Sequence, residues 1–242
     1  MESISEVNYT DDMSTYILKF LYRSSRFLFR KLYSCWSTFY AKYVFLVNDV
    51  KYGSGFKSNG IPIIDINKKC QFRIGDSFKI NNGLHFNRIG RQQPCFFIAD
   101  YGGIISIGDN VGLSGTAIVC HKQVSIGSNV RIGGNTVIYD TDFHNLDFVE
   151  RTVAKEDMST VIKKAIVIED NVFIGAHSTI LKGVTIGRNS IIGASSVVTK
   201  NVPTNQIWGG NPARFLKYIG SEHDSNDKQQ IDEFVNSFFD VK

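Results

Sequence analysis

Branched aliphatic residues recur at every sixth position in the second half of the chain. The clearest run is Ile168, Ile174, Ile180, Ile186, Ile192 and Val198, and the residue two places before each of them is small or β-branched. A spacing of two puts both residues on one face of a strand, and a spacing of six returns that face to the same direction after a turn. An α-helix would need apolar spacings of three and four. The pattern predicts a coil of short parallel strands, with three six-residue steps in each turn and successive turns about 4.8 Å apart.

This series of aliphatic positions spaced by six, which we call the frame, extends toward the N-terminus with two irregular steps. It runs through Ile126, Ile132 and Ile138, through Ile107, Leu113 and Val119, and more loosely through Ile74, Ile80 and Phe86. Glycine follows many of these residues, and Asn or Asp comes soon after, as tight turns require. A step of seven before Ile126 and one of 21 before Ile107 predict that residues bulge outward at both places.

The pattern resembles the hexapeptide-repeat acyltransferases. The resemblance spans residues 70–219 and is most specific where VSIGSNVRIGG, YDTDFHNLD, VFIGAHSTILKGVTIGRNSIIGASSVVTKNVP and GGNPAR follow one another. The chain looks most like the sugar O-acetyltransferase branch, which includes maltose and galactoside acetyltransferases and polysaccharide-modifying enzymes. The resemblance implies a mainly β protein, folded as a left-handed parallel β-helix, that forms a homotrimer and takes acetyl-CoA as its acyl donor.

The frame lapses once, after Ile138, and resumes in phase at Ile168. The intervening loop, residues 140–166, is charged and irregular, and a long loop on a regular scaffold is more often functional than accidental. In acyl transfer to a hydroxyl, a neutral imidazole is the side chain best matched to removing the proton near pH 7. His144 in the DTDFH segment is therefore the predicted general base, and Asp142 is the predicted carboxylate that orients it. A polar loop residue without a catalytic role is the alternative for His144.

The resemblance assigns the donor site to the second block of coils. The residues implied in binding acetyl-CoA are Phe173, Ala176, Ala194, Thr199, Lys200, Arg214 and Lys217. Arg214 and Lys217 would meet the phosphates, for which guanidinium and ammonium groups are suited. Phe173 replaces a tryptophan common in the family, and Ala176 replaces a serine of the sugar acetyltransferases, so an oxyanion would depend on backbone N–H groups. No metal is implied.

Three residues are candidates for contact with the acceptor. Ser114 and Asn135 belong to coils that precede the loop, and Asp140 begins the loop itself. Ser114 and Asn135 fit ordinary turn or outward-facing positions equally well, so this assignment rests on their place in the chain alone.

The two ends of the chain differ from the repeat. Residues 13–48 contain no acid, and Lys19, Arg23, Arg26 and Arg30 form a basic stripe at helical spacing, with Ile17, Leu21, Leu28 and Leu32 on another face. Such a helix can lie in an anionic membrane interface or pack against the coil or a neighbouring subunit, and packing is favoured. Near the other end, Ile231, Phe234, Val235, Phe238 and Phe239 predict a short amphipathic helix.

Composition adds limits to this organisation. The 242 residues are predicted to form an N-terminal helical region (1–55), an acyltransferase coil (56–205) and a CoA-contacting segment with a helix (206–242). A net charge of +4 is too small to indicate nucleic-acid binding without a concentrated patch. No run of eighteen uncharged apolar residues occurs, and the first residues carry acids. A cytoplasmic protein is therefore expected, with the inner face of the membrane as an alternative position.

The sequence thus predicts an acetyl-CoA-dependent O-acetyltransferase that acts on a carbohydrate hydroxyl, in a surface or capsular polysaccharide or its precursor. N-acetylation of a sugar nucleotide is an alternative within the same class. A γ-type carbonic anhydrase is another, although the spacing of His121, His144 and His177 counts against its three-histidine zinc site. The last alternative is a trimeric scaffold protein without catalytic activity.

Overall fold

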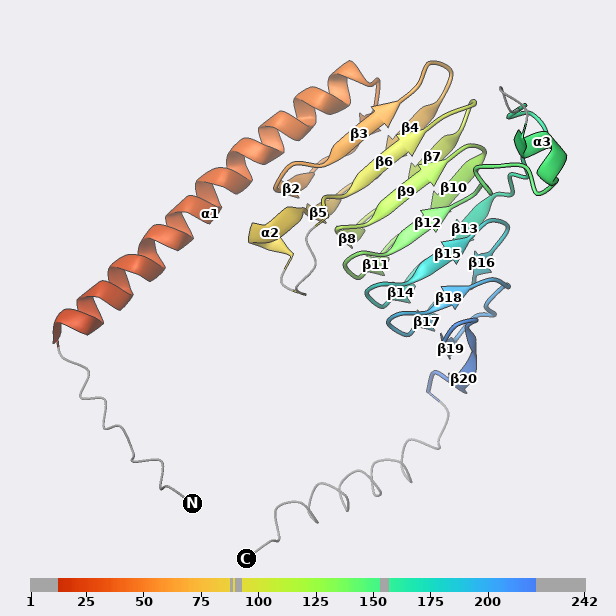
Figure 1. Ribbon diagram of the computed structural model, residues 1–242. Coiled ribbons are helices and arrows are strands. Elements are labelled where there is room, and N and C mark those ends of the chain that lie inside the picture. Colours follow the sequence, from red (N-terminus) through yellow and green to blue (C-terminus); the bar gives the residue numbers. More distant parts are fainter. Residues whose placement is uncertain (1–12, 88, 90–92, 153–156, 221–242) are drawn as a thin grey trace, which may run out of the picture.

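The computed structural model describes residues 13–87, 89, 93–152 and 157–220. These residues form a coil of three parallel sheets with a long helix at its N-terminal end (Figure 1). Each turn of the coil passes through the first, second and third sheet in that order, so that strands inside a sheet pair with the strands one turn before and one turn after. The predicted coil of short parallel strands is confirmed.

The strands of the three sheets are short. The first sheet contains β1 (Lys51–Tyr52), β4 (Gln71–Ile74), β7 (Ile104–Ile107), β10 (Gln123–Ile126), β13 (Ile166–Ile168) and β16 (Thr185–Ile186). The second contains β2 (Lys57–Asn59), β5 (Lys79–Asn81), β8 (Gly112–Ser114), β11 (Arg131–Ile132), β14 (Phe173–Ile174), β17 (Ile191–Ile192), β19 (Gln206–Gly209) and the antiparallel β20 (Arg214–Tyr218). The third contains β3 (Ile63–Ile66), β6 (Phe96–Ala99), β9 (Ala117–Cys120), β12 (Val137–Tyr139), β15 (Thr179–Leu181) and β18 (Val197–Val198).

The six-residue frame is the core of the coil. All six frame residues from Ile168 to Val198, and all six companions two places earlier, are at most 1% exposed. Three of the companions are serines, and their buried hydroxyls donate to backbone carbonyls; Ser178 Oγ, for example, lies 2.9 Å from the oxygen of Gly175. Burying these hydroxyls therefore costs little free energy, because each has a hydrogen-bond partner.

One edge of the coil is a column of asparagines between the first and second sheets. Asn110, Asn129, Asn171, Asn189 and Asn205 each adopt a positive φ of 53–62°, which asparagine tolerates better than most residues. Their side-chain amides donate in series, each Nδ2 to the Oδ1 of the next turn, at 2.7–3.1 Å. We call this the asparagine edge; its side chains bond mainly to one another.

Two details of the predicted frame are wrong. The inward residue of β9 is Ile118, which is fully buried and pairs with Ile138, whereas Val119 is half-buried. The turn after Leu113 is one residue shorter than the turn after Ile132, and this shifts the frame. Phe86 is not a frame residue either, because it ends the short helix α2 (Gly83–Phe86) outside the sheets.

The coil also begins earlier than residue 56. The first parallel strand, β1, lies at Lys51–Tyr52 and pairs with β4. The first turns have phenylalanines in their core where the later turns have aliphatic residues: Phe56, Phe72, Phe78 and Phe97 are at most 6% exposed. The aliphatic frame reaches back to Ile74 and Ile80 in the second turn, and it could not detect the first turn, whose core contains Phe56.

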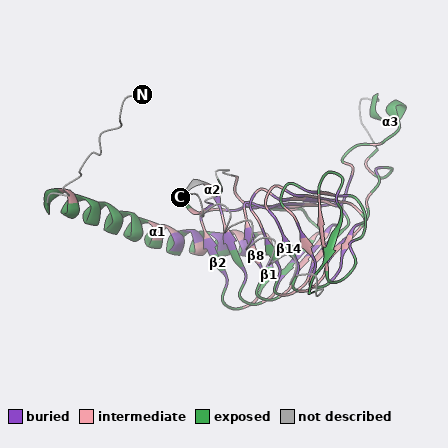
Figure 2. Ribbon diagram, turned by 90° about the horizontal axis from the view of Figure 1, so that it is seen from below, coloured by how far each residue is buried: buried purple, intermediate pink, exposed green. Residues whose placement is uncertain are grey.

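Helix α1 (Met13–Val47) closes the N-terminal end of the coil with its C-terminal half only. Ser34, Ser37, Ala41 and Phe45 are its buried residues. The Phe45 ring lies 4.8 Å from that of Phe56, and Ser37 Oγ donates to the oxygen of Ser58 at 2.8 Å. The other half projects beyond the coil (Figure 2). The packing that the sequence favoured is thus confirmed for half of the helix.

Two points concern the ends of the chain. Among the described helices, none has both the length and the apolar character that crossing a membrane requires. The helix predicted from Ile231 to Phe239 lies outside the described residues.

Candidate active site

The long loop leaves the coil between β12 and β13, at the edge that joins the third sheet to the first. We call this the loop edge; of the described residues it contains 120–123, 140–152, 157–165, 182–184 and 199–201. The loop begins with a narrow neck, in which Thr141 forms an antiparallel bridge with Lys163 and Asp142 N donates to the oxygen of Ile162 at 3.2 Å. Helix α3 (Phe148–Thr152) lies in its outer part, which stands away from the sheets in both ribbon views (Figures 1 and 2).

Asp140 anchors the base of this loop. Its side chain is fully buried, and its carboxylate accepts the backbone N–H groups of His121, Lys122 and Gln123, each at 2.7 Å. The thiol of Cys120 lies 3.3 Å from the same carboxylate. Hydrogen bonds to an ionised acceptor are stronger than neutral ones. Asp140 thus ties the start of the loop to the preceding turn, with its oxygens facing the backbone.

Asp142 and His144 follow along the loop. Asp142 Oδ1 forms an ion pair with Lys182 Nζ at 2.5 Å, which connects the neck to the end of β15. The other oxygen, Oδ2, is buried and has no hydrogen-bond partner within the described part of the chain. His144 is exposed, two residues further along the loop. The structure therefore holds Asp142 firmly and presents the imidazole of His144 on the outside of the coil.

His121 is a further residue of this edge, which the sequence analysis considered only for a zinc site. It is 7% exposed, its ring contacts those of Tyr101 at 4.8 Å and Phe143 at 5.9 Å, and Lys163 Nζ lies 4.5 Å from the centre of the Tyr101 ring. Burial lowers the pKa of His121, so its ring is neutral near pH 7. The seven-residue step before Ile126 was the available signal; counted from the inward residue Ile118 the step is eight, so two extra residues lie at this corner.

The second edge of interest joins the second sheet to the third. Ala176 and Ala194 occupy equivalent positions there in successive turns, and we call it the alanine edge. A Cβ on Gly133 would lie 2.5 Å from the nitrogen of Ala176, and one on Gly175 would lie 2.4 Å from the nitrogen of Ala194. Successive turns therefore approach each other closely here. Ala194 is exposed and Ala176 half-buried, so small side chains line this edge.

The seven residues assigned to coenzyme A divide between the two edges. Arg214 lies on β20 opposite Gly209, beside the alanine edge, and Phe173 is 46% exposed on the second sheet. Lys217 lies on β20 as well. Thr199 and Lys200 follow β18 and lie, exposed, at the loop edge.

The predicted acceptor residues other than Asp140 lie at the alanine edge. Asn135 adopts φ 59° at the turn after β11, and Ser114 ends β8 one turn earlier. The sequence reasoning missed Asn87, which is 6% exposed and whose amide would lie 2.8 Å from a Cβ on Gly115. Within the described residues, Nδ2 of Asn87 and Oδ1 of Asn135 are buried without a hydrogen-bond partner. The 21-residue step before Ile107 was the signal for this inserted segment.

The histidines considered for a metal site do not meet within one chain. His121 and His144 belong to the loop edge, whereas His177 adopts φ 63° at the alanine edge. No group of three or more His, Cys, Asp or Glu that could hold a metal ion occurs in the described part of the chain.

Within one chain, the catalytic candidates Asp142 and His144 therefore lie far from the alanine edge. The loop edge and the alanine edge lie on opposite sides of the third sheet, at the two ends of β12, β15 and β18. A cleft that contains both requires that two copies of the chain lie side by side.

Comparison with known proteins agrees with this fold. The family model described as bacterial transferase hexapeptide (six repeats) matches residues 165–200. The chain is 30% identical over 153 residues to WbbJ of Escherichia coli (strain K12), described as a putative lipopolysaccharide biosynthesis O-acetyl transferase, and the match covers 62% of this chain and 72% of WbbJ.

Two further relatives are more distant. The chain is 28% identical over 106 residues to gamma carbonic anhydrase 1 of Arabidopsis thaliana, covering 42% of this chain and spanning only 38% of that protein. AntD, an N-acyltransferase from Bacillus cereus, was solved with dTDP and 3-hydroxybutyryl-CoA. It has a TM-score of 0.54 at 20% identity, over 77% of this chain and 89% of AntD, and so shares the fold. With its buried six-residue frame and its match over most of WbbJ, the chain belongs to the hexapeptide-repeat family of bacterial transferases.

Proposed function

We propose that the protein is an acetyl-CoA-dependent O-acetyltransferase that acts on a carbohydrate hydroxyl of a surface polysaccharide or its precursor. The observation that carries this proposal is the anchored loop that presents His144 at one edge of the coil, in a chain 30% identical to WbbJ, which is described as a putative lipopolysaccharide biosynthesis O-acetyl transferase. The neck of the loop and the buried Asp140 carboxylate hold the segment that carries His144 in one position, and a general base must be positioned in this way.

The transfer is direct. His144 takes the proton of the acceptor hydroxyl as its oxygen attacks the thioester carbonyl, and the carbon–sulfur bond then breaks. The imidazolium returns the proton to the leaving thiolate, so that the products are the ester and coenzyme A. Ala176 has no hydroxyl, and the oxyanion is therefore stabilised by backbone N–H groups. Asp142, held by Lys182, is the proposed orienting carboxylate, because its second oxygen has no other described partner.

The active site lies between two subunits of a homotrimer. The loop edge of one copy faces the alanine edge of the next, so that Ala176 and Ala194 line the pantetheine arm opposite His144. The aromatic ring of Phe173 and the cations Arg214 and Lys217 belong to the same side, and Thr199 and Lys200 to the other. The opposite positions of the two edges in one chain support this arrangement. The left-handed coil typical of the family is part of the proposal.

The acceptor binds near Asn135 and Ser114. The unpartnered amide oxygen of Asn135 and the amide nitrogen of Asn87 offer an acceptor and a donor to a sugar hydroxyl. Asp140 is left out of this set, because its carboxylate is buried against backbone N–H groups.

Replacement of the base tests the chemistry. His144→Ala is expected to lower acetyl transfer by on the order of 100- to 10,000-fold, while acetyl-CoA affinity and the circular dichroism spectrum stay unchanged. His85→Ala is the matched control, since His85 packs against Phe29 and Tyr33 near α1. Transfer to a panel of sugars, sugar nucleotides and capsular oligosaccharides identifies the acceptor, and a preference for amino groups would contradict O-acetylation. A His144→Ala variant with full activity would refute the proposed base.

Mixed subunits test the assembly. His144→Ala and Ala194→Trp each remove activity, the second by blocking the arm of coenzyme A. In a trimer assembled from equal amounts of both variants, a working site combines the loop of one with the edge of the other, and about one quarter of the activity returns. If each site were built within one chain, no mixture would recover activity.

A further inference from the structure

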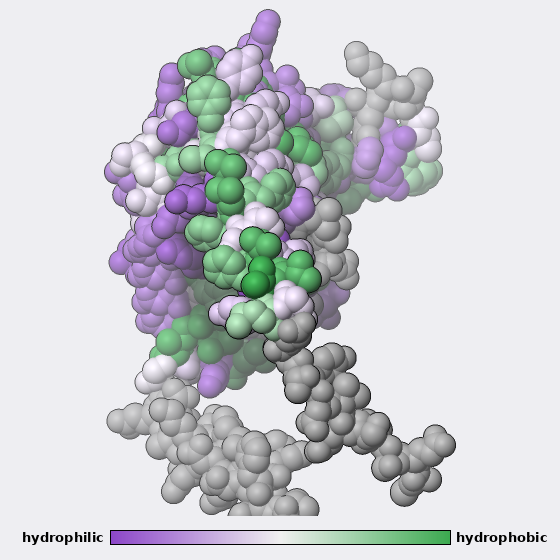
Figure 3. All heavy atoms as spheres, turned by 90° about the vertical axis from the view of Figure 1, so that its left-hand side faces the viewer, coloured by the Kyte–Doolittle hydropathy of each residue, from purple (hydrophilic) through white to green (hydrophobic). Residues whose placement is uncertain are grey.

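Helix α1 is amphipathic along its length, and its N-terminal half extends beyond the coil. Ile17, Leu21, Leu28, Leu32, Phe39, Tyr43 and Leu46 follow one another at spacings of four, seven, four, seven, four and three, and all are 50–74% exposed. These spacings place all seven on one face of the helix. The view of the side on which α1 lies shows hydrophobic residues gathered along it (Figure 3). This face, which we call the apolar face of α1, has no partner within the described chain.

The opposite face changes character along its length. Near the C-terminal end it consists of the buried residues Ser34, Ser37, Ala41 and Phe45. The same face continues toward the N-terminus at spacings of three and four as Arg30, Arg26 and Arg23. The helix therefore presents arginines on the side of the coil and apolar residues on the side away from it.

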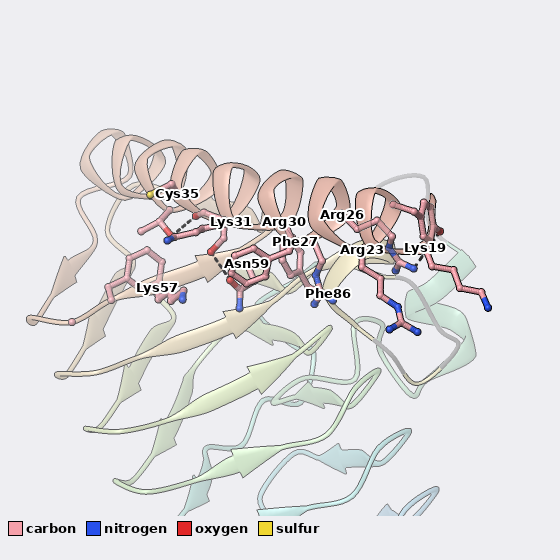
Figure 4. Close-up of a pocket in the computed structure, with 15 residues that line it drawn as sticks. Lys19, Arg23, Arg26, Phe27, Arg30, Lys31, Cys35, Lys57, Asn59 and Phe86 are labelled. Atoms are coloured by element: carbon pink, nitrogen blue, oxygen red, sulfur yellow. Dashed lines mark hydrogen bonds between the residues drawn. The ribbon is translucent and has the colours of Figure 1, made fainter. Parts of the chain in front are cut away.

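Between the arginines and the first turn of the coil lies a groove of about 1090 Å³. Among the described residues, it is lined by six cations, namely Lys19, Arg23, Arg26, Arg30, Lys31 and Lys57, and by no carboxylate. Arg23 points from the helix toward the side of the strands (Figure 4), and the guanidinium of Arg30 lies 5.4 Å from the centre of the Phe86 ring. Such a groove suits phosphate groups, which arginine binds through paired hydrogen bonds.

We propose that α1 seats the protein on the surface of an anionic phospholipid membrane. The apolar face enters the boundary between headgroups and acyl chains, and the cationic groove receives the headgroup phosphates at the level of the coil. Amphipathic helices with a cationic polar face bind membranes in this way, and each Lys or Arg near the surface adds to the attraction. Trp36, which is 51% exposed, lies in this helix and reports its surroundings.

The charge pattern favours a membrane over a second copy of the helix. Helices that bundle with one another have a narrow apolar seam flanked by charges of both signs. Residues 13–48 hold six Lys and Arg residues and no acid, so bundled copies of α1 would bring like charges together. An anionic surface compensates these charges.

Binding to vesicles tests the proposal. The full chain is expected to cosediment with vesicles of phosphatidylcholine and phosphatidylglycerol, to bind pure phosphatidylcholine weakly, and to dissociate as the salt concentration rises. In a Trp208→Phe background, the fluorescence of Trp36 shifts to shorter wavelength on binding. Binding that ignores the anionic lipid, or an unchanged Trp36 spectrum, would overturn the proposal.

A triple variant and its matched control test the contribution of the arginines to membrane binding. Arg23→Gln, Arg26→Gln and Arg30→Gln together are expected to lower partitioning on the order of 100-fold. The matched control changes the exposed Lys68, Arg73 and Arg188 to Gln, which removes the same charge and leaves binding within about twofold, since none of these side chains lines the cationic groove.

The apolar face has its own variant. Leu21→Asn, Leu28→Asn and Leu32→Asn together are expected to lower partitioning at least about tenfold. The oligomeric state, measured by light scattering, stays unchanged in this variant; if it changes, the face is covered by another copy and the membrane proposal is wrong. Acetyl-CoA affinity, measured in parallel, is retained, so failure here is distinct from failure of the proposed enzymatic function.

Discussion

The anchor of the loop can be tested by a single isosteric change, Asp140→Asn. The carboxylate accepts three backbone N–H groups at 2.7 Å in a fully buried position. An amide of the same shape retains one acceptor oxygen and turns an NH₂ group toward at least one N–H donor. In its best orientation the oxygen keeps the bonds from Lys122 and Gln123, and the amide nitrogen faces the N–H of His121.

The magnitude follows from the bonds that change. One charge-assisted hydrogen bond is lost, a buried donor is left without an acceptor, and the remaining two bonds become neutral. Together these changes lower the free energy of unfolding by about 2–5 kcal/mol. The loss is local to the base of the loop, so activity is expected to fall at temperatures where the coil itself remains folded.

Urea unfolding followed by circular dichroism measures the change, at matched protein concentrations because association contributes to stability. Asp65→Asn is the control: Asp65 is exposed on β3, and its effect is expected to stay within about 0.5 kcal/mol. If Asp140→Asn instead unfolds like the parent but raises the KM for the acceptor alone, the carboxylate faces the acceptor and the structural role argued here is wrong.

Three further predictions use other parts of the coil. Burial lowers the pKa of His121 below 6.5, so the unfolded chain binds its proton first; this contribution to stability is complete above about pH 6.5 and is lost as the pH falls toward the folded pKa. His121→Gln should remove that part of the pH dependence of urea unfolding. Gly175→Ala places a Cβ 2.4 Å from backbone and should cost about 1–3 kcal/mol, whereas the Cβ of Gly193→Ala meets nothing closer than 3.5 Å and should cost less, as thermal unfolding of the pair will show. Burial raises the pKa of Cys95 to about 12, so a maleimide at neutral pH should modify the exposed Cys35 and reach Cys95 only after unfolding.

The coil was predictable from sequence because its core repeats strictly. The frame positions recur with a period of six, and Ile, Leu or Val fills each of them from Ile107 to Val198. The prediction failed where a turn changed length by one residue, before Ile118, and where the core of the first turn is aromatic, at Phe56. Both failures have the same cause, because a search for aliphatic residues at every sixth position misses a turn of another length and a core residue of another type.

The site was less predictable, because residues distant in the sequence meet at its edges. The loop itself was visible as a lapse of the frame, and His144 could be chosen within it. The role of Asp140 was not visible, since its partners are backbone N–H groups 17–19 residues earlier that leave no trace in side-chain pattern. Asn87 was hidden for a related reason: only the fold places it next to Gly115.

The three edges of the coil carry different chemistry, and that difference bears on where catalysis can occur. The asparagine edge bonds to itself turn after turn, with amide contacts of 2.7–3.1 Å. The alanine edge carries small side chains at Ala176 and Ala194, and the loop edge carries the long loop between β12 and β13. A flexible thioester arm needs an uncovered edge, and proton transfer needs a positioned base, yet the third sheet separates the two within one chain. The cyclic trimer proposed above would remove the conflict, because its symmetry would set the loop edge of each copy beside the alanine edge of the next. On this reasoning assembly is part of the catalytic mechanism, and a monomer that folds correctly should still be inactive.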